Sequence, residues 1–154
     1  MAIHKIDGVD GVVNYPKKFV TLWTTLAASA SITKGDVVIL ETDITQANGE
    51  GLYVQPSDAS DSVITVGVAA ETVTNGAGAT RDHPIRVQVA GYNDTCTSAA
   101  SINLDVLVSS SAAGDVRTAA DTSNTAKPFA LCVNAFAGTT NDGAIMIFDH
   151  GMYG

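Results

Sequence analysis

Short runs of β-branched and aromatic residues, each closed by a turn signal, set the strongest limit on how this chain can fold. Side chains branched at Cβ favour extended backbone over helix. The runs predict strands at 36–41, 51–55, 63–70, 85–90, 104–109, 115–117, 129–136 and 144–148. Gly- and Asn-rich connectors separate them, and these residues tolerate the positive φ angles of tight turns. The pattern predicts a compact all-β domain, an antiparallel β-sandwich or barrel.

The hydrophobic pattern also predicts which faces of the strands are buried. In the strand at 85–90 apolar residues alternate with Arg86 and Gln88, which predicts one buried and one solvent-facing side. The runs at 37–40 and 145–148 are apolar throughout. We expect those two to be buried on both faces or to lie at a subunit interface.

Length and charge restrict the function classes. The 154 residues are enough for one domain with a real core, and we expect one domain with arms. Acidic residues outnumber basic ones by 16 to 8, and the net charge of -8 disfavours binding to nucleic acid or to anionic lipid. No apolar run reaches the length of a transmembrane helix, so we expect no membrane partner.

The stretch 17–40 resembles a secretory signal peptide, with two lysines, an apolar run and then Ala28-Ser29-Ala30. Two features weigh against export. A long segment containing Asp7 and Asp10 precedes the lysines, and threonines interrupt the apolar run in a way that suits a strand. We expect the segment to belong to the working protein, made in the cytoplasm.

Residues 1–31 differ in kind from the rest and are predicted to form an extended N-terminal arm, with residues 32–154 as the single β domain. Glycines and an Asn-Tyr-Pro turn signal punctuate the arm, yet it carries Trp23, the only tryptophan, and other large apolar groups. Such groups pack either against the chain's own core or against another chain. Removing residues 1–30 is expected to leave a folded domain.

The sequence offers no catalytic, cofactor or metal constellation. His83 follows Asp82 at a predicted strand entrance without a nucleophile motif, and His150 lacks the spacing of a metal site. Cys132 is flanked by apolar residues and is predicted to be a small buried side chain, whereas Cys96 is expected in a loop. Whether the two cysteines are bonded stays open.

Five short runs together resemble the head decoration, or capsid cement, proteins of tailed bacteriophages. They are 32–38 (ITKGDVV), 66–69 (VGVA), 87–91 (VQVAG), 113–116 (AGDV) and 129–131 (FAL). The resemblance spans most of residues 32–148. It implies a structural virion protein without catalysis that binds the outer surface of the expanded head and cements neighbouring capsid subunits.

The resemblance also implies partners and an interface. The major capsid protein is the expected partner, and homotrimers are expected on the capsid. The protein is expected on the outer surface of the virion head. No cofactor is expected. An N-terminal arm laid over neighbouring subunits is common in such proteins. By residue type, the interface residues expected in it are Tyr15, Pro16, Lys17, Lys18, Phe19, Leu22 and Trp23.

Other function classes remain alternatives. A secreted or tail-associated β-rich adhesin is the main one, and it gains if the N-terminus is processed. A biotin or lipoate carrier is suggested by Lys34-Gly35-Asp36, but no lysine sits at a hairpin tip. A small β hydrolase would have to use Asp82 and His83.

Overall fold

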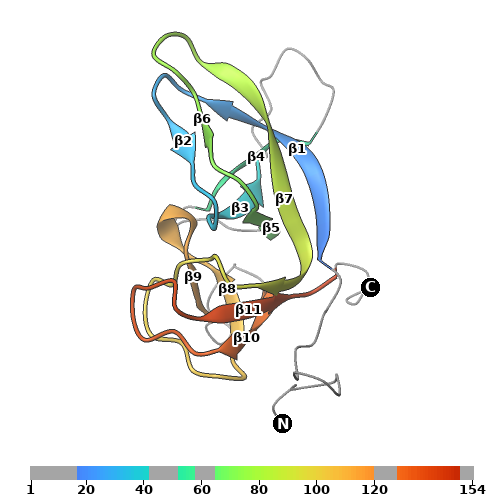
Figure 1. Ribbon diagram of the computed structural model, residues 1–154, viewed down its shortest axis with the longest axis vertical. Helices are drawn as coiled ribbons and strands as arrows, with labels where there is room; N and C mark the ends of the chain where they lie inside the picture. Colours follow the sequence, from blue (N-terminus) through green and yellow to red (C-terminus); the bar gives the residue numbers. More distant parts are fainter. Residues whose placement is uncertain (1–16, 42–51, 58–64, 120–127, 150–154) are drawn as a thin grey trace, which may run out of the picture.

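The computed structural model describes residues 17–41, 52–57, 65–119 and 128–149, and within these ranges the fold is all-β (Figure 1). One short 3-10 helix, Ala112–Gly114, is present among them. The strands are β1 Lys18–Leu26, β2 Ser31–Ile32, β3 Val37–Leu40, β4 Val54–Pro56, β5 Thr65–Ala69, β6 Val73–Thr74, β7 Arg81–Asn93, β8 Leu107–Ser110, β9 Val116–Thr118, β10 Ala130–Asn134 and β11 Ala144–Ile147. The predicted all-β class is confirmed.

The strands form a curled antiparallel sheet of nine strands that does not close into a barrel, together with a separate pair β2–β6. The order along the sheet is β4-β3-β5-β7-β11-β10-β8-β9, and β1 pairs with β7 off this path. Figure 1 shows two stacked lobes, with β1 to β6 in the upper one and β8 to β11 in the lower one. Strand β7 runs through both lobes and joins them.

A bend at Gly91 allows β7 to pair with strands of both lobes. Residues from Arg81 to Ala90 pair with β1, whereas Gly91 to Asn93 pair with β11. Gly91 has a φ of 93°, a left-handed conformation that a residue with a Cβ adopts only with strain. The bend therefore sits where β7 changes partner.

Pro84 lies inside β7, although the sequence pattern predicted that this strand begins after it. Its cross-strand partner is Trp23, whose N–H points away from β7 and donates to the carbonyl of Leu52 at 3.0 Å. Trp23 and Pro84 are therefore a non-hydrogen-bonded pair, and the missing N–H of proline costs no bond to β1. The strand continues through the proline for that reason.

Two cores lie on either side of β3 and β5. Val38 and Ala69 belong to the upper core, whereas their neighbours Val37 and Val68 belong to the lower one. Successive residues of a strand point to opposite faces, so these two strands form a layer between the cores. The prediction that the apolar run 37–40 is buried on both faces is confirmed for Val37, Val38 and Ile39.

The structure differs from the sequence pattern at two positions that bear on the site. Gln88, predicted on a solvent-facing side of its strand, is only 3% exposed, because its amide is enclosed at the bend of β7. Cys96 lies in a loop after β7, as expected, but its side chain is fully buried in the lower core together with Cys132, and both are free thiols. The short strands β2 and β6 were not predicted.

Candidate interaction surface

Strand β1 carries most of the residues that the sequence singled out, and it lies in the sheet. It pairs with β7 over its full length, from Lys18 opposite Ala90 to Leu26 opposite Arg81. The described part of the predicted arm is therefore a strand of the upper lobe. Cutting the chain at residue 30 would remove this strand and with it Leu26, which is part of the upper core.

The two faces of β1 differ. Leu22, Thr24 and Leu26 point toward the upper core and become more buried along the strand. Phe19, Thr21, Trp23 and Thr25 alternate with them on the other face. Their cross-strand partners on that outer face are Gln88, Arg86, Pro84 and Asp82.

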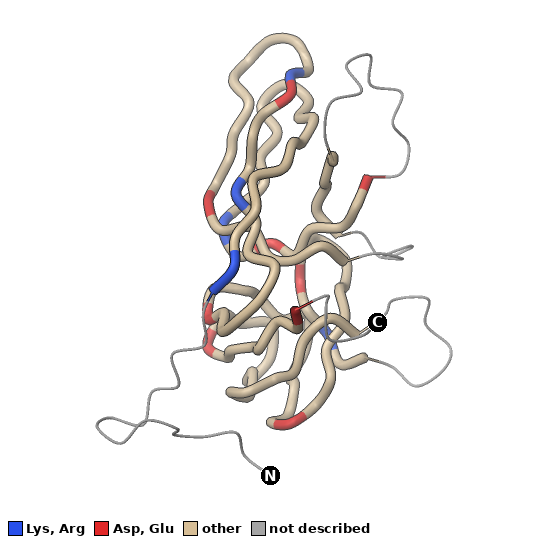
Figure 2. Tube along the Cα trace, turned by 90° about the vertical axis from the view of Figure 1, so that its right-hand side faces the viewer, with Lys and Arg blue, Asp and Glu red and all other residues tan. Residues whose placement is uncertain are grey.

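Phe19 and Arg86 make a contact between the two strands of the outer face. The guanidinium of Arg86 lies over the Phe19 ring, 4.1 Å from its centroid. Phe19 is still 37% exposed, so the pair presents an aromatic edge and a cation side by side to solvent. Figure 2 shows basic residues along the β1 and β7 side of the upper lobe.

Trp23 is fixed through its backbone while its ring remains accessible. Its bond to Leu52 brings the start of β4 next to β1, and Trp23 and Tyr53 form a bridge. Trp23 is 38% exposed and Leu52 is 59% exposed, so two large apolar side chains face solvent at this junction. An exposed apolar pair on a rigid strand is a common form of protein interaction site.

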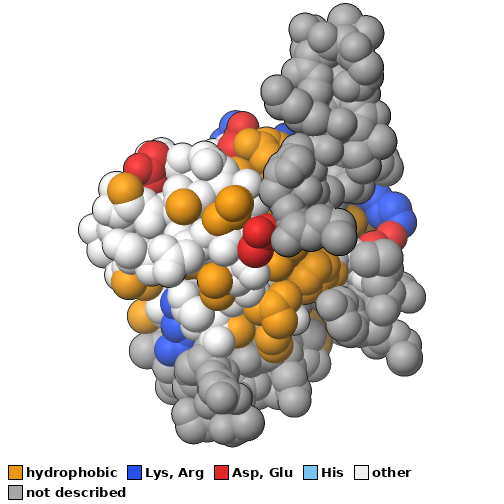
Figure 3. Space-filling model, turned by 90° about the horizontal axis from the view of Figure 1, so that it is seen from below, with side chains coloured by type: hydrophobic (Ala, Val, Ile, Leu, Met, Phe, Trp, Pro, Cys, Tyr) orange, Lys and Arg blue, Asp and Glu red, His pale blue; other side chains and the backbone are white. Residues whose placement is uncertain are grey.

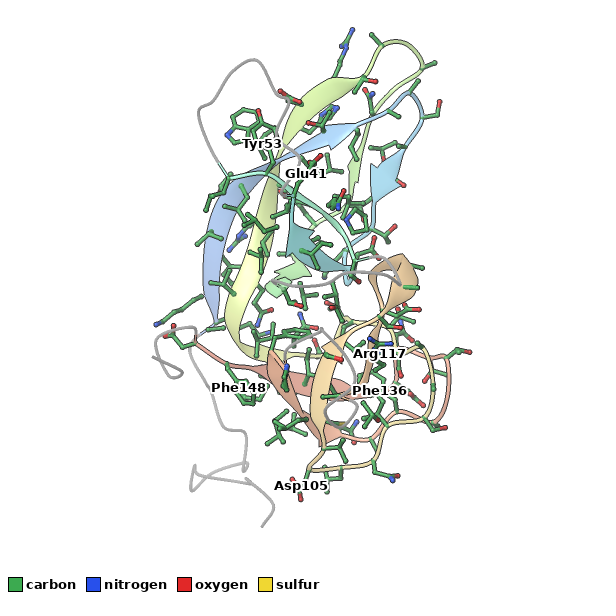
Figure 4. All side chains as sticks on the ribbon, turned by 180° about the vertical axis from the view of Figure 1, so that it is seen from behind. Glu41, Tyr53, Asp105, Arg117, Phe136 and Phe148 are labelled. Carbon is green, nitrogen blue, oxygen red and sulfur yellow. The ribbon has the colours of Figure 1, made fainter. Side chains whose placement is uncertain are left out.

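A partly buried polar contact supports this junction. The Tyr53 hydroxyl donates to Asp82 at 3.1 Å, and the Thr25 hydroxyl donates to the other oxygen of the same carboxylate at 2.8 Å. Burial raises the pKa of Tyr53, and the carboxylate of Asp82 raises it further. Tyr53 lies beside the upper half of β1 (Figure 4) and links β1, β4 and β7.

The two lysines that begin this segment have partners within the chain. The ammonium of Lys17 lies over the Tyr92 ring, 5.7 Å from its centroid. Lys18 forms an ion pair with Asp149. The side chain of Lys18 is 57% exposed and that of Asp149 is 42% exposed. A surface ion pair of this kind adds little stability, so Lys18 can exchange Asp149 for a partner's carboxylate at small cost.

The structure brings together five of the seven predicted interface residues, Lys17, Lys18, Phe19, Leu22 and Trp23. Of these, Leu22 points toward the core. Tyr15 and Pro16 lie outside the described residues. Sequence reasoning missed Arg86 and Leu52, which complete the surface, and Val20, which is exposed on the opposite face of β1. Arg86 could have been found from its alternation in β7, whereas Leu52 joins through a tertiary contact that no local pattern reveals.

A second group of apolar side chains lies at the other end of the molecule. Seen from below, hydrophobic side chains are exposed on the lower lobe (Figure 3), where Leu104 and Leu107 are 47% and 44% exposed. Leu107 faces Leu131, Leu131 faces Met146, and Met146 faces Tyr92 in successive strands. These four side chains form a row across the outer face of the lower sheet.

The residues considered for catalysis are not arranged for it. Asp82 and His83 are consecutive in β7 and point to opposite faces, and the carboxylate of Asp82 already accepts from Tyr53 and Thr25. Within the described ranges no group of three His, Cys, Asp or Glu residues could hold a metal ion. His4 and His150 lie outside those ranges. None of the described residues forms a helix able to cross a bilayer.

Comparison with known proteins shows a likeness to a solved structure. No protein-family model matches the chain, and no curated protein matches it either. Among solved structures, the chain is similar to one described as the crystal structure of head fiber gp8.5 N base in bacteriophage phi29. The TM-score is 0.57, the sequence identity is 13%, and the match covers 86% of this chain and 96% of that chain. At this identity the likeness shows a shared fold.

Proposed function

We propose that this chain is a structural protein of a bacteriophage virion that attaches to the outer surface of the head and cements neighbouring capsid subunits. The observation that carries the proposal is the fold, which matches the base of a phage head fiber over 86% of this chain. A fold alone does not transfer function, so the proposal also needs a surface suited to attachment. The outer face of β1 supplies one.

The β1 surface has the composition of a protein contact. It combines Phe19, Trp23 and Leu52, each more than a third exposed, with the cation Arg86. Aromatic residues and arginine are enriched among residues that dominate binding energy. We place the contact with the major capsid protein here, with Lys17 and Lys18 at its margin.

Residues 1–16 are the rest of the predicted arm. They lie outside the described residues, and their place in the proposal comes from their position before β1. We propose that they extend over a neighbouring capsid subunit. Removing residues 1–16 keeps β1 in the sheet, so this truncation tests the arm without removing a strand, as a cut at residue 30 would do.

A non-catalytic role fits the chemistry of the described residues, because a cement protein acts through buried contact area alone. Each contact is repeated by the symmetry of the shell, so a modest affinity per copy is multiplied over the particle. The net charge of -8 keeps decorated particles dispersed. Homotrimers at local three-fold positions are part of the same proposal.

The experiment uses heads that lack this chain, produced by the phage that encodes it. The purified full chain is added, and the copies bound per head are counted by quantitative mass spectrometry after sedimentation. We expect saturation at a fixed ratio to the major capsid protein. Absence of binding would overturn the attachment proposal.

Cementing is tested separately from attachment. Heads with and without bound chain are heated, and release of the genome is followed with a dye that fluoresces on DNA. Cementing predicts release at higher temperature for decorated heads, because the added contacts span subunit seams. Equal release temperatures for saturated and bare heads would leave attachment in place and overturn cementing. Sedimentation of the free chain gives its oligomeric state.

A further inference from the structure

Among the described residues, the first half of β1 pairs along one edge only. One edge of the strand pairs with β7. On the other edge, the described residues provide a single backbone bond, from the Trp23 N–H to Leu52. Alternate residues of a strand direct their N–H and C=O groups to the same edge, so Phe19 and Thr21 direct theirs outward as Trp23 does. The groups of Phe19 and Thr21 have no strand beside them among the described residues.

This edge is protected only at its start, where Lys18 and an irregularity between Lys18 and Phe19 lie; from Phe19 to Leu22 the described residues place no charged side chain, proline or covering strand on it. Lys18, Phe19, Val20 and Thr21 are exposed on both faces of the sheet, and Val20 is 38% exposed. Protected edges carry proline, inward-pointing charges or a covering loop. Here three consecutive residues with high strand propensity follow Lys18. Such an edge is a template for one more strand.

The length of the free edge is defined at its far end. Leu52 occupies the edge at Trp23, so an added strand is limited to the stretch from Lys18 to Leu22. The Phe19 side chain would lie on one face of the extended sheet, and the Val20 side chain would lie on the other face. Side chains of alternate residues in the added strand would cover these two apolar groups.

Charge indicates what kind of strand fits. Arg86 lies beside Thr21 on the Phe19 side, and the only ion pair among the described residues joins Lys18 to Asp149. A carboxylate on the added strand near Thr21 would come within reach of the Arg86 guanidinium. A second copy of this chain paired edge to edge would bring its own Phe19 or Thr21 there, and neither of these side chains offers the guanidinium a carboxylate. Within the chain, the Glu71 carboxylate accepts from the backbone N–H of Arg86 at 2.8 Å. An acidic segment of another protein therefore fits better.

We propose that an extended acidic segment of the capsid partner adds as a strand to the free edge of β1 and hydrogen-bonds to Phe19 and Thr21. The proposal deepens the proposed function and rests on it, because the capsid protein is taken as the partner. It differs from a contact made by side chains alone, since the backbone of β1 becomes part of a sheet shared by two proteins.

The test is a proline that removes one outward N–H. Thr21→Pro removes the N–H donor on the free edge. It leaves the hydrogen bonds between β1 and β7 intact, because the backbone N–H of Thr21 points away from β7. Thr21→Val is the matched control, because it keeps the N–H and the strand propensity. Binding of both variants and of the unmodified chain to heads lacking the chain is measured by sedimentation. We expect Thr21→Pro to bind about tenfold or more weakly and Thr21→Val to bind as the unmodified chain does.

The outcomes separate the two proposals. If the unmodified chain does not bind heads, both fail. If it binds and Thr21→Pro binds equally well, attachment stands and strand addition is overturned. A dimer of the free chain that Thr21→Pro converts to monomer would assign the edge to a second copy and also overturn the proposal.

A second measurement covers the case in which Thr21→Pro does not fold. Amide hydrogen exchange of the unmodified chain is followed with and without heads. Strand addition predicts that the Thr21 and Phe19 amides exchange rapidly in the free chain and become protected on the head. If these amides exchange equally fast in both states, no strand is added.

Discussion

The side-chain amide of Asn93 donates a hydrogen bond of 3.1 Å to the side-chain oxygen of Gln88, across the bend of β7 at Gly91. Gln88 in turn donates to the carbonyls of Ala90 and Tyr92 on either side of the bend. The Asn93 oxygen accepts from the N–H groups of Thr95 and Cys96. Two buried amides thus satisfy the backbone where β7 passes from one lobe to the other.

Replacing Asn93 should destabilise the whole fold. Asn93→Ala leaves the buried oxygen of Gln88 and two backbone N–H groups without partners, which we expect to cost about 2–3 kcal/mol of unfolding free energy. Urea unfolding followed by circular dichroism measures the loss. Asn134→Ala is the control, because Asn134 makes an exposed bond to the carbonyl of Asp142. Equal unfolding midpoints for the two variants would contradict the role given to Asn93.

Gly67 should tolerate no side chain. A Cβ at this position of β5 would lie 2.1 Å from the carbonyl oxygen of Gln88, so β5 and β7 would have to separate. We expect Gly67→Ala to cost about 3 kcal/mol or more. At Gly76 a Cβ would meet nothing within 4 Å. Gly76→Ala should change the unfolding free energy by less than about 0.5 kcal/mol, and a large loss there would argue against this explanation.

Trp23 should matter more for attachment than for stability. Trp23 is 38% exposed, and its backbone bond to Leu52 does not depend on the side chain. We expect Trp23→Ala to weaken head binding by about tenfold or more with a shift of only a few degrees in melting temperature. Leu104→Ala, at the far end of the molecule, is the control and should bind normally. A variant that mainly unfolds would make Trp23 a structural residue of the junction.

Stability should fall in alkaline solution because of Cys96. Burial raises the pKa of this thiol from an ordinary 9.0 to about 12. Between these two values the unfolded chain loses the proton while the folded chain keeps it, so stability is fully present below pH 9.0 and declines toward pH 12. Urea midpoints at about pH 8 and about pH 10.5 measure the decline.

Cys96→Ala isolates this contribution to the pH dependence. The variant loses packing in the lower core at every pH, but its midpoint should fall less between the two pH values than that of the unmodified chain. Tyr53, whose pKa is also raised by burial, is present in both proteins and cancels in the comparison. Equal declines would show that Cys96 does not set the alkaline limit.

Local patterns in the sequence were enough to predict the fold class and most of the strands. β-branched runs and Gly- or Asn-containing turns are local signals, and the structure has strands at all the predicted runs, with shifted ends. The continuous apolar run of β3 indicated burial on both faces, and β3 lies between two cores. The resemblance to phage head proteins agrees with a fold shared with a phage head-fiber base.

Tertiary structure decided where β1 lies and which residues form the surface. Glycines and a proline near the N-terminus suggested a separate arm, but nine residues of it pair with β7, because the alternate residues Leu22 and Leu26 can bury one face of β1. The partners of a strand lie far away in the chain, here about 60 residues along at Arg86 and Pro84. The local pattern therefore indicated the aromatic residues of the surface, whereas only the folded chain joined them to Arg86 and Leu52.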